Sequence, residues 1–160
     1  RFFLEHAGPT YTRGEHDMLP FLINMALLFE RFVAAWLRRH LPPSHSLKVQ
    51  EHVDVSDGTL RFDIDLVVYE VGSGKPCCVL DTKYKAAQTP SNADIYQVVT
   101  YAQLKGTTEA VLLYPASSIQ RLDVRIGPTR VRTLPFDLGR DLDQAGEELL
   151  CCLPGLGGPP

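Results

Sequence analysis

The fold is decided by two stretches, LRFDIDLVVYE at residues 60–70 and CCVLDTK at residues 77–83. Both are rich in β-branched and aliphatic side chains, which favour strands. The glycines and serine at residues 72–74 predict a hairpin loop between them. The second stretch is apolar from residue 77 to residue 80, as expected of a central strand that is buried on both faces. We therefore expect the two strands to pair inside a sheet.

Helices and further strands are predicted on both sides of this pair. The longest predicted helix covers residues 17–40, with Asp17 as its cap and the prolines at 42–43 as its end. The other predicted helices are 91–105 and 141–152, and the other predicted strands are 47–53, 110–114, 122–126 and 131–134. We expect strand 110–114 to lie beside strand 77–83, and strand 122–126 to be half exposed. This order predicts a single α/β domain with a mixed central sheet flanked by helices.

Composition narrows the class of protein. The chain has 160 residues, 44% of them hydrophobic, and a net charge of -3, which excludes both wholesale disorder and a basic histone-like protein. No signal peptide or long apolar run is present, so we expect a cytoplasmic protein without membrane contact. The four cysteines form two adjacent pairs without metal-ligand spacing, which predicts reduced thiols. The first residue is Arg1, which suggests a domain taken from a longer chain.

Acidic residues interrupt both central strands. Asp63 and Asp65 are two residues apart, as are Asp81 and Lys83, so each pair shares one face of its strand. The hairpin can bring Asp65 beside Asp81, and two converging carboxylates need a compensating cation. Lys83 can supply that charge, and Mg²⁺ or Mn²⁺ suits such oxygen ligands. The alternative is an exposed strand face with ordinary ion pairs.

The helix predicted after these strands adds two polar side chains. Gln97 and Tyr101 are four residues apart, and therefore lie on one helix face. If this face packs toward the sheet, the two side chains can orient Lys83 or hold a phosphate group. The alternative is an amphipathic helix whose glutamine and tyrosine simply meet solvent.

These residues together carry a resemblance to a known family. The sequences IDLVV at 64–68, DTK at 81–83 and QVVTY at 97–101 resemble the RecB-type branch of the PD-(D/E)XK nucleases. The sequences FERF at 29–32, LDTKYK at 80–85 and DIYQ at 94–97 are similar to McrC, the nuclease subunit of modified-cytosine restriction systems. The resemblance covers about residues 18–115 and implies a restriction-endonuclease-like fold.

The resemblance also implies roles for individual residues. Asp65, with Asp63 as the fallback, Asp81, the backbone carbonyl of Thr82, and Glu30 would bind Mg²⁺, for which Mn²⁺ can substitute. Lys83 would act on the attacking water or the phosphate. Residues with supporting roles are Gln97 and Tyr101, which would position the phosphate or Lys83, and Tyr84 and Lys85, which would contact DNA.

The implied activity is that of a Mg²⁺-dependent endodeoxyribonuclease, which hydrolyses DNA phosphodiester bonds in a McrBC-like, modification-dependent restriction system. A McrB-like AAA+ GTPase would be its partner through a region outside this chain, and a dimer would serve double-strand cleavage. The expected organisation is a leading segment (1–16), a nuclease domain (17–153) and a flexible tail (154–160). Two alternatives stay open: another RecB-like DNA repair nuclease, and a non-catalytic nuclease-fold module that binds DNA or acts as a scaffold.

Overall fold

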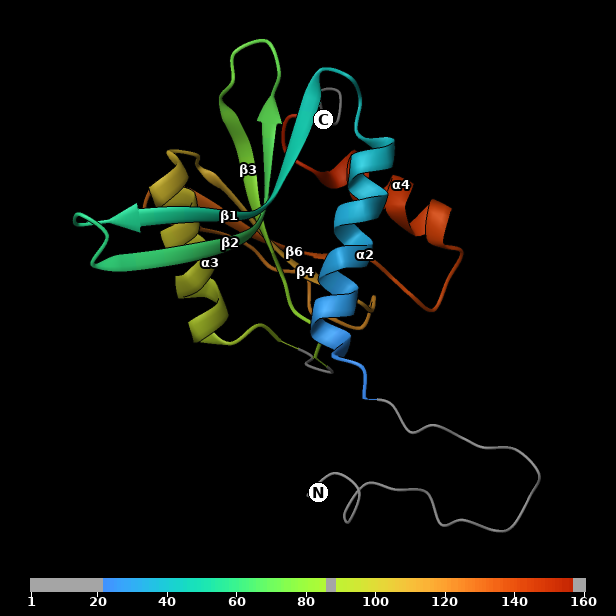
Figure 1. Cartoon of the computed structure of the whole chain (residues 1–160). Helices are drawn as coiled ribbons and strands as arrows, with labels where there is room; N and C mark the ends of the chain where they lie inside the picture. The colour runs from blue at the N-terminus through green and yellow to red at the C-terminus, as the bar shows by residue number, and fades with distance from the viewer. Residues whose placement is uncertain (1–21, 86–88, 157–160) are drawn as a thin grey trace.

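The structure is a computed structural model and describes residues 22–85 and 89–156. This part of the chain forms three helices and six strands, and three strands separate each helix from the next (Figure 1). In chain order they are α2 (Met25–His40), β1 (His45–Val55), β2 (Leu60–Glu70), β3 (Pro76–Thr82), α3 (Asn92–Lys105), β4 (Glu109–Tyr114), β5 (Asp123–Ile126), β6 (Thr129–Pro135) and α4 (Leu142–Cys152).

All six strands belong to one mixed sheet, in the order β1-β2-β3-β4-β6-β5. The pairs β3–β4 and β4–β6 are parallel, and the other pairs are antiparallel. Helix α3 connects the parallel neighbours β3 and β4, which is the usual solution because parallel strands need a long crossover. The predicted pairing of strand 110–114 with strand 77–83 is confirmed.

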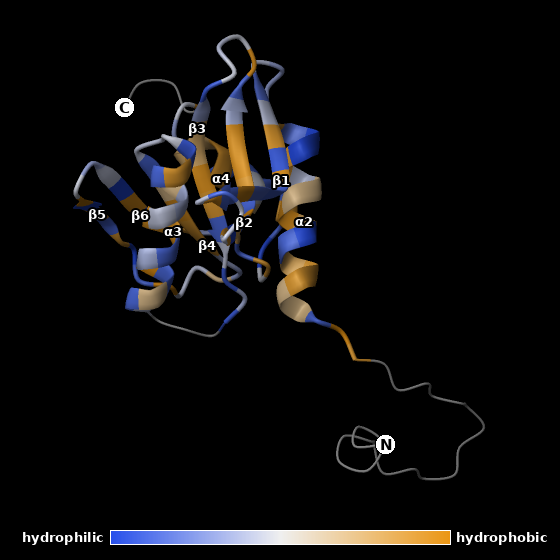
Figure 2. Ribbon diagram, turned by 60° about the vertical axis from the view of Figure 1, so that its left-hand side comes forward, coloured by the Kyte–Doolittle hydropathy of each residue, from blue (hydrophilic) through white to orange (hydrophobic). Residues whose placement is uncertain are grey.

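Helices cover both faces of the sheet, so the protein has three layers (Figure 2). One hydrophobic cluster joins α2 and α4 to the first face, through side chains such as Trp36, Leu66 and Leu113. A second cluster joins α3 to the other face, through side chains such as Val98, Val79 and Leu112. The α/β class and the central sheet flanked by helices are confirmed, and the arrangement is consistent with a PD-(D/E)XK-like nuclease fold.

Strand β3 runs through the middle of this core. Its residues Cys78, Val79, Leu80 and Asp81 are buried, as predicted for a strand covered on both faces. Three of these four are apolar, so Asp81 is the exception. A buried carboxylate is costly unless its charge is compensated, so Asp81 marks a candidate functional site.

Strands β1 and β2 change direction midway along their length (Figure 1). Val49 of β1 pairs with Leu66 of β2, and Glu51 pairs with Ile64. Gln50, between Val49 and Glu51, has no paired residue on β2. The backbone of Gln50 has a φ of 51°, which lies in the left-handed region that residues other than glycine rarely adopt. The ladder is therefore interrupted opposite Asp65.

Three predictions of local structure need correction. Helix α2 begins at Met25, because the side chain of Asn24 caps it by accepting a hydrogen bond from the Leu27 amide at 3.1 Å. The expected cap, Asp17, lies outside the described residues. Strand β5 is exposed throughout, not half exposed, because it is an edge strand that no helix covers. Strand β1 is longer than predicted, since it pairs with β2 along nearly all of its length.

All four cysteines are free thiols, as predicted. None of the described helices is long and apolar enough to cross a membrane.

Candidate active site

The hairpin between β2 and β3 brings two aspartates together. Leu66 pairs with Leu80, so the next residues along the two strands, Asp65 and Asp81, stand side by side. One oxygen of Asp65, Oδ2, accepts hydrogen bonds from the backbone N–H of Thr82 at 2.8 Å and from its hydroxyl at 2.9 Å. Asp81 is only 1% exposed. Two carboxylates therefore converge where β3 ends.

Lys83 links this acidic pair to helix α3. Its Nζ lies 2.5 Å from Oδ2 of Asp81, as an ion pair without the geometry of a hydrogen bond. The same ammonium group donates a hydrogen bond to Oε1 of Gln97 at 2.9 Å, and Nε2 of Gln97 donates to the hydroxyl oxygen of Tyr101 at 2.7 Å. The predicted helix face thus meets the sheet, and four predicted site residues form one connected chain.

The charges in this cluster are not balanced. The pKa of Asp81 is raised to about 7, mainly by burial and then by the negative charge of Asp65, although Lys83 opposes both effects. Burial also raises the pKa of Tyr101, with contributions from Asp81 and Asp65 that exceed the opposing effect of Lys83. A single lysine does not neutralise the two aspartates, so the cluster favours an additional cation.

A second tyrosine, Tyr114 at the end of β4, lies in the same electrostatic field. Its side chain is 1% exposed, and its hydroxyl has no hydrogen-bond partner among the described residues. Burial raises the pKa of Tyr114, and the negative charges of Asp94 and Asp81 add to this effect. The sequence analysis did not identify Tyr114, because a tyrosine at the end of an apolar strand is ordinary for a core residue.

The two further acids proposed for the site are placed differently. Glu30 on α2 accepts a hydrogen bond from Nε2 of Gln50 at 2.5 Å. Burial raises the pKa of Glu30, the Gln50 amide opposes this, and the charge of Asp65 adds to it, so Glu30 lies within the field of the site. Asp63, the fallback acid, is exposed and contacts Nδ1 of His52 at 2.5 Å. The hairpin therefore brings Asp65, and not Asp63, to Asp81.

The two residues proposed to contact DNA follow directly after Lys83. Tyr84 is exposed at 39%, and its ring packs against Phe29 of α2 at a centroid distance of 6.0 Å. Lys85 forms an ion pair with Asp94, whose carboxylate also accepts a hydrogen bond from the Ser91 amide at 3.1 Å in the capping box of α3. Burial opposes ionisation of Asp94, but the hydrogen bonds from Lys85 and Ser91 hold its pKa below the usual value. Lys85 thus ties the segment after β3 to the start of α3.

The residues present fit a small divalent cation. Oδ2 of Asp81 is buried and has the Lys83 ammonium group as its one close polar partner among the described residues. Two carboxylates with a backbone carbonyl nearby form a hard oxygen donor set. Within residues 22–85 and 89–156, no three His, Cys, Asp or Glu side chains lie close enough to make a metal cluster by themselves. Mg²⁺ usually keeps several waters and is bound through one or two carboxylates, so a site for it does not require a third acidic side chain.

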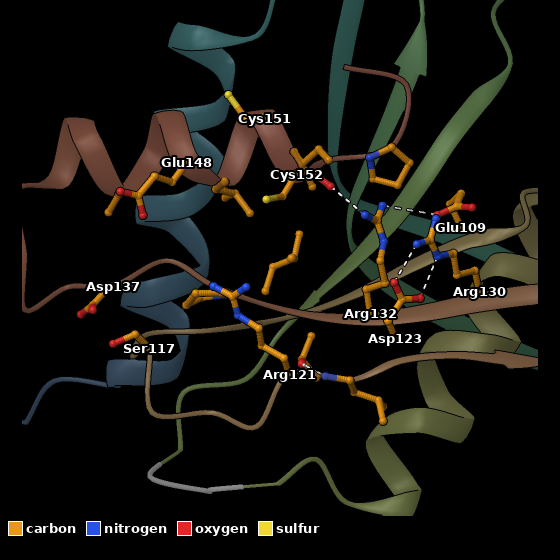
Figure 3. Close-up of a pocket in the computed structure, with 18 of the residues that line it drawn as sticks. Glu109, Ser117, Arg121, Asp123, Arg130, Arg132, Asp137, Glu148, Cys151 and Cys152 are labelled. Atoms are coloured by element: carbon orange, nitrogen blue, oxygen red, sulfur yellow. Dashed lines mark hydrogen bonds and ion pairs between the residues drawn. The ribbon is translucent and has the colours of Figure 1, made fainter. Parts of the chain in front are cut away.

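A cavity of about 770 Å³ lies elsewhere, between α4 and strands β5 and β6 (Figure 3). None of the predicted site residues lines it. Its wall carries paired charges: Arg130 binds both carboxylate oxygens of Asp123, at 2.8 and 2.6 Å, and Arg132 contacts Glu109 at 3.4 Å. Because these charges neutralise one another, the cavity lacks the unbalanced charge found at the end of β3, which is therefore the stronger candidate site.

Comparison with known proteins identifies the family of the chain. A family model described as "McrBC 5-methylcytosine restriction system component" matches residues 1–115. The match includes β2, β3 and α3, which position the cluster, and ends directly after β4. No curated protein matches the chain.

Proposed function

The chain belongs to the McrBC family of 5-methylcytosine restriction system components, and we propose that it is the DNA-cleaving part of such a system. The reaction would be Mg²⁺-dependent hydrolysis of DNA phosphodiester bonds by an endodeoxyribonuclease. One observation carries this proposal: Asp65, Asp81 and Lys83 converge at the end of β3, where Asp81 is almost fully buried. Buried charges of this kind are concentrated at functional sites.

The metal would be held by Asp65, Asp81 and the backbone carbonyl of Thr82, with Glu30 on the side of Asp65. Such an ion supplies neutralisation of phosphate charge and a lower pKa for an attacking water. Asp65 is already oriented for this role, because both of its hydrogen bonds from Thr82 are accepted by Oδ2. Its Oδ1 accepts no hydrogen bond from the described part of the chain, and is free to act as a ligand.

Lys83 would stabilise the negative charge that develops on the phosphate. The side chain is 17% exposed, so the ammonium group is partly shielded from water but still accessible to a bound strand. Positive charge fixed in such a place stabilises a transition state more than a mobile surface charge does. Gln97 and Tyr101 keep the ammonium group in position, because Gln97 accepts from Lys83 and donates to Tyr101.

DNA would be the substrate, and the residues of β3 and α3 that reach the surface would meet its backbone. Tyr84 and Lys85 stand next to Lys83 in sequence, and Tyr84 is exposed. Phosphate contacts give affinity but do not read sequence. Recognition of modified DNA would therefore come from the partner, a McrB-like AAA+ GTPase in the cytoplasm, and two copies of the nuclease would cut both strands.

The test is Mg²⁺-dependent cleavage of methylated plasmid DNA, with and without the McrB-like partner. Asp81→Asn and Lys83→Ala should lose cleavage, whereas Asp123→Asn, which removes a carboxylate at the cavity, should retain it. Equal cleavage by the wild type and both site variants would overturn the proposal. If the wild type does not cut DNA, Mn²⁺ titration calorimetry tests the metal site instead. A wild-type chain that binds no Mn²⁺ would also overturn the proposal.

A further inference from the structure

Gln50 is held in a strained conformation in the middle of strand β1. Its φ of 51° lies in the left-handed region, although β1 is otherwise an extended strand. Such a backbone is unfavourable at a residue other than glycine, and persists where the surroundings require it. Gln50 interrupts the ladder between Val49 and Glu51, directly opposite Asp65 on β2. The strain therefore lies one strand away from the proposed metal ligands.

The side chain of Gln50 makes a contact that an ordinary strand residue would not make. Its Nε2 donates a hydrogen bond to Oε1 of Glu30 at 2.5 Å, which connects the middle of β1 to helix α2. No other described residue donates a hydrogen bond to Glu30. One oxygen of this carboxylate is thus held by Gln50, and the other is left for a ligand.

The Gln50 amide is the largest influence that favours the charged form of Glu30. Burial and, less strongly, the negative charge of Asp65 raise the pKa of Glu30, and the amide of Gln50 and the charge of Arg31 oppose them. A carboxylate that is free to rotate would turn away from Asp65 toward water. A neutral amide can hold it in place without supplying the positive charge that would compete with a cation.

We propose that Gln50 is a positioning residue for the metal site: its left-handed backbone directs the side-chain amide to Glu30 and holds that carboxylate beside Asp65. This inference rests on the proposed function. Glu30 need not touch the ion, because Mg²⁺ keeps several of its waters and a nearby carboxylate can accept hydrogen bonds from them. Partners that orient metal ligands in this way typically change metal affinity by about 10-fold to 100-fold when they are removed.

The experiment is Mn²⁺ titration calorimetry on the full chain, with variants that separate the backbone of Gln50 from its amide. Gln50→Gly deletes the amide but favours the left-handed backbone, so it should fold at least as well as the wild type. Gln50→Met deletes the amide but keeps the length of the side chain and the strain. We expect both variants to weaken Mn²⁺ binding by about 10-fold, because both lose the same hydrogen bond.

A double-mutant cycle shows whether Gln50 acts through Glu30. Glu30→Gln should weaken Mn²⁺ binding, and adding Gln50→Gly to it should cause no further loss. The inference is overturned if the two Gln50 variants bind Mn²⁺ like the wild type, if Glu30→Gln does so, or if the losses add in the double variant.

Asp81→Asn separates this inference from the proposed function. If Asp81→Asn abolishes Mn²⁺ binding while the Gln50 variants retain it, the positioning role fails and the metal site stands. If Asp81→Asn binds Mn²⁺ as tightly as the wild type, the metal site itself is wrong and the positioning role falls with it.

Discussion

The end of β3 and the cavity beside α4 both contain several charged side chains, but they differ in how these charges are matched. At the cavity, Arg130 binds both oxygens of Asp123, and Arg140 binds both oxygens of Glu148 at 2.9 Å. At the end of β3, Lys83 pairs with Asp81, and Asp65 has no cationic partner among the described residues.

The electrostatics follow from this difference. The pKa of Asp123 is held below its usual value by Arg130, whereas burial raises the pKa of Asp81 to about 7. Matched ion pairs in contact with water contribute little to stability, and they leave no unbalanced charge for a ligand to neutralise. Unmatched charge inside the protein favours a ligand that completes it. The cavity beside α4 is therefore the poorer candidate for the site.

Removal of one positive charge from each region gives the largest expected contrast. Lys83→Met should lower the rate of DNA cleavage by about 10²-fold to 10³-fold, because the charge that stabilises the transition state is lost. Arg130→Met, which removes a cation at the cavity, should leave the rate unchanged. Single-turnover cleavage assays measure both, and a similar loss in the two variants would remove the distinction between the regions.

A packing change near the cavity should have the opposite pattern: it should lower the stability of the protein and leave metal binding unchanged. Gly146 on α4 faces Trp36 of α2, and a Cβ at this position would lie 2.1 Å from Cζ2 of the indole ring. Gly146→Ala should therefore lower the free energy of unfolding by about 1–3 kcal/mol, as overpacking does elsewhere. Denaturant unfolding measures this, and Mn²⁺ affinity should stay unchanged.

Gly72 provides the matched control for this substitution. A Cβ there would have no atom within 4 Å, so Gly72→Ala should leave the free energy of unfolding nearly unchanged. If Gly146→Ala were as stable as Gly72→Ala, the close contact between α2 and α4 would be wrong.

The smallest predicted effect concerns the pH dependence of stability in the metal-free protein. The pKa of Asp81 rises from 3.8 to about 7 on folding, so between these values the folded state binds more protons than the unfolded state. The free energy of unfolding should therefore fall as the pH rises from about 4 to about 7. Asp81→Asn should remove this contribution and be more stable than the wild type at pH 8, on the order of 1 kcal/mol.

Chemical denaturation of the wild type and Asp81→Asn across this pH range checks the prediction, because the difference between the two curves isolates Asp81. Parallel curves would mean that Asp81 titrates normally and that its burial carries no electrostatic cost.

Much of the sheet and of α3 was predictable, because the turn residues and helix caps that define them lie close by in the sequence. The ends of β2 at Leu60 and Glu70 match the prediction, since turn residues lie on both sides of the strand. Helix α3 begins after Ser91, a strong cap, and ends before Gly106, which adopts a φ of 70°. The convergence of Asp65 with Asp81 followed from the hairpin alone.

Other features were not predictable because they depend on tertiary contacts. Asp17 and Asn24 are both good helix caps in sequence, and only the fold selects Asn24. The left-handed conformation of Gln50 leaves no trace in the sequence, since the alternation of β1 continues through it. The ion pair between Lys85 and Asp94 joins segments whose approach depends on how α3 packs.

The account depends most on the claim that Asp65 and Asp81 together bind a divalent cation. Anomalous diffraction from a crystal soaked in Mn²⁺ tests this directly. The account predicts one strong anomalous peak within ligand distance of both carboxylates, and its absence in an Asp81→Asn crystal soaked in the same way. A peak that lies away from Asp65 and Asp81, or one that persists unchanged in Asp81→Asn, would contradict the account.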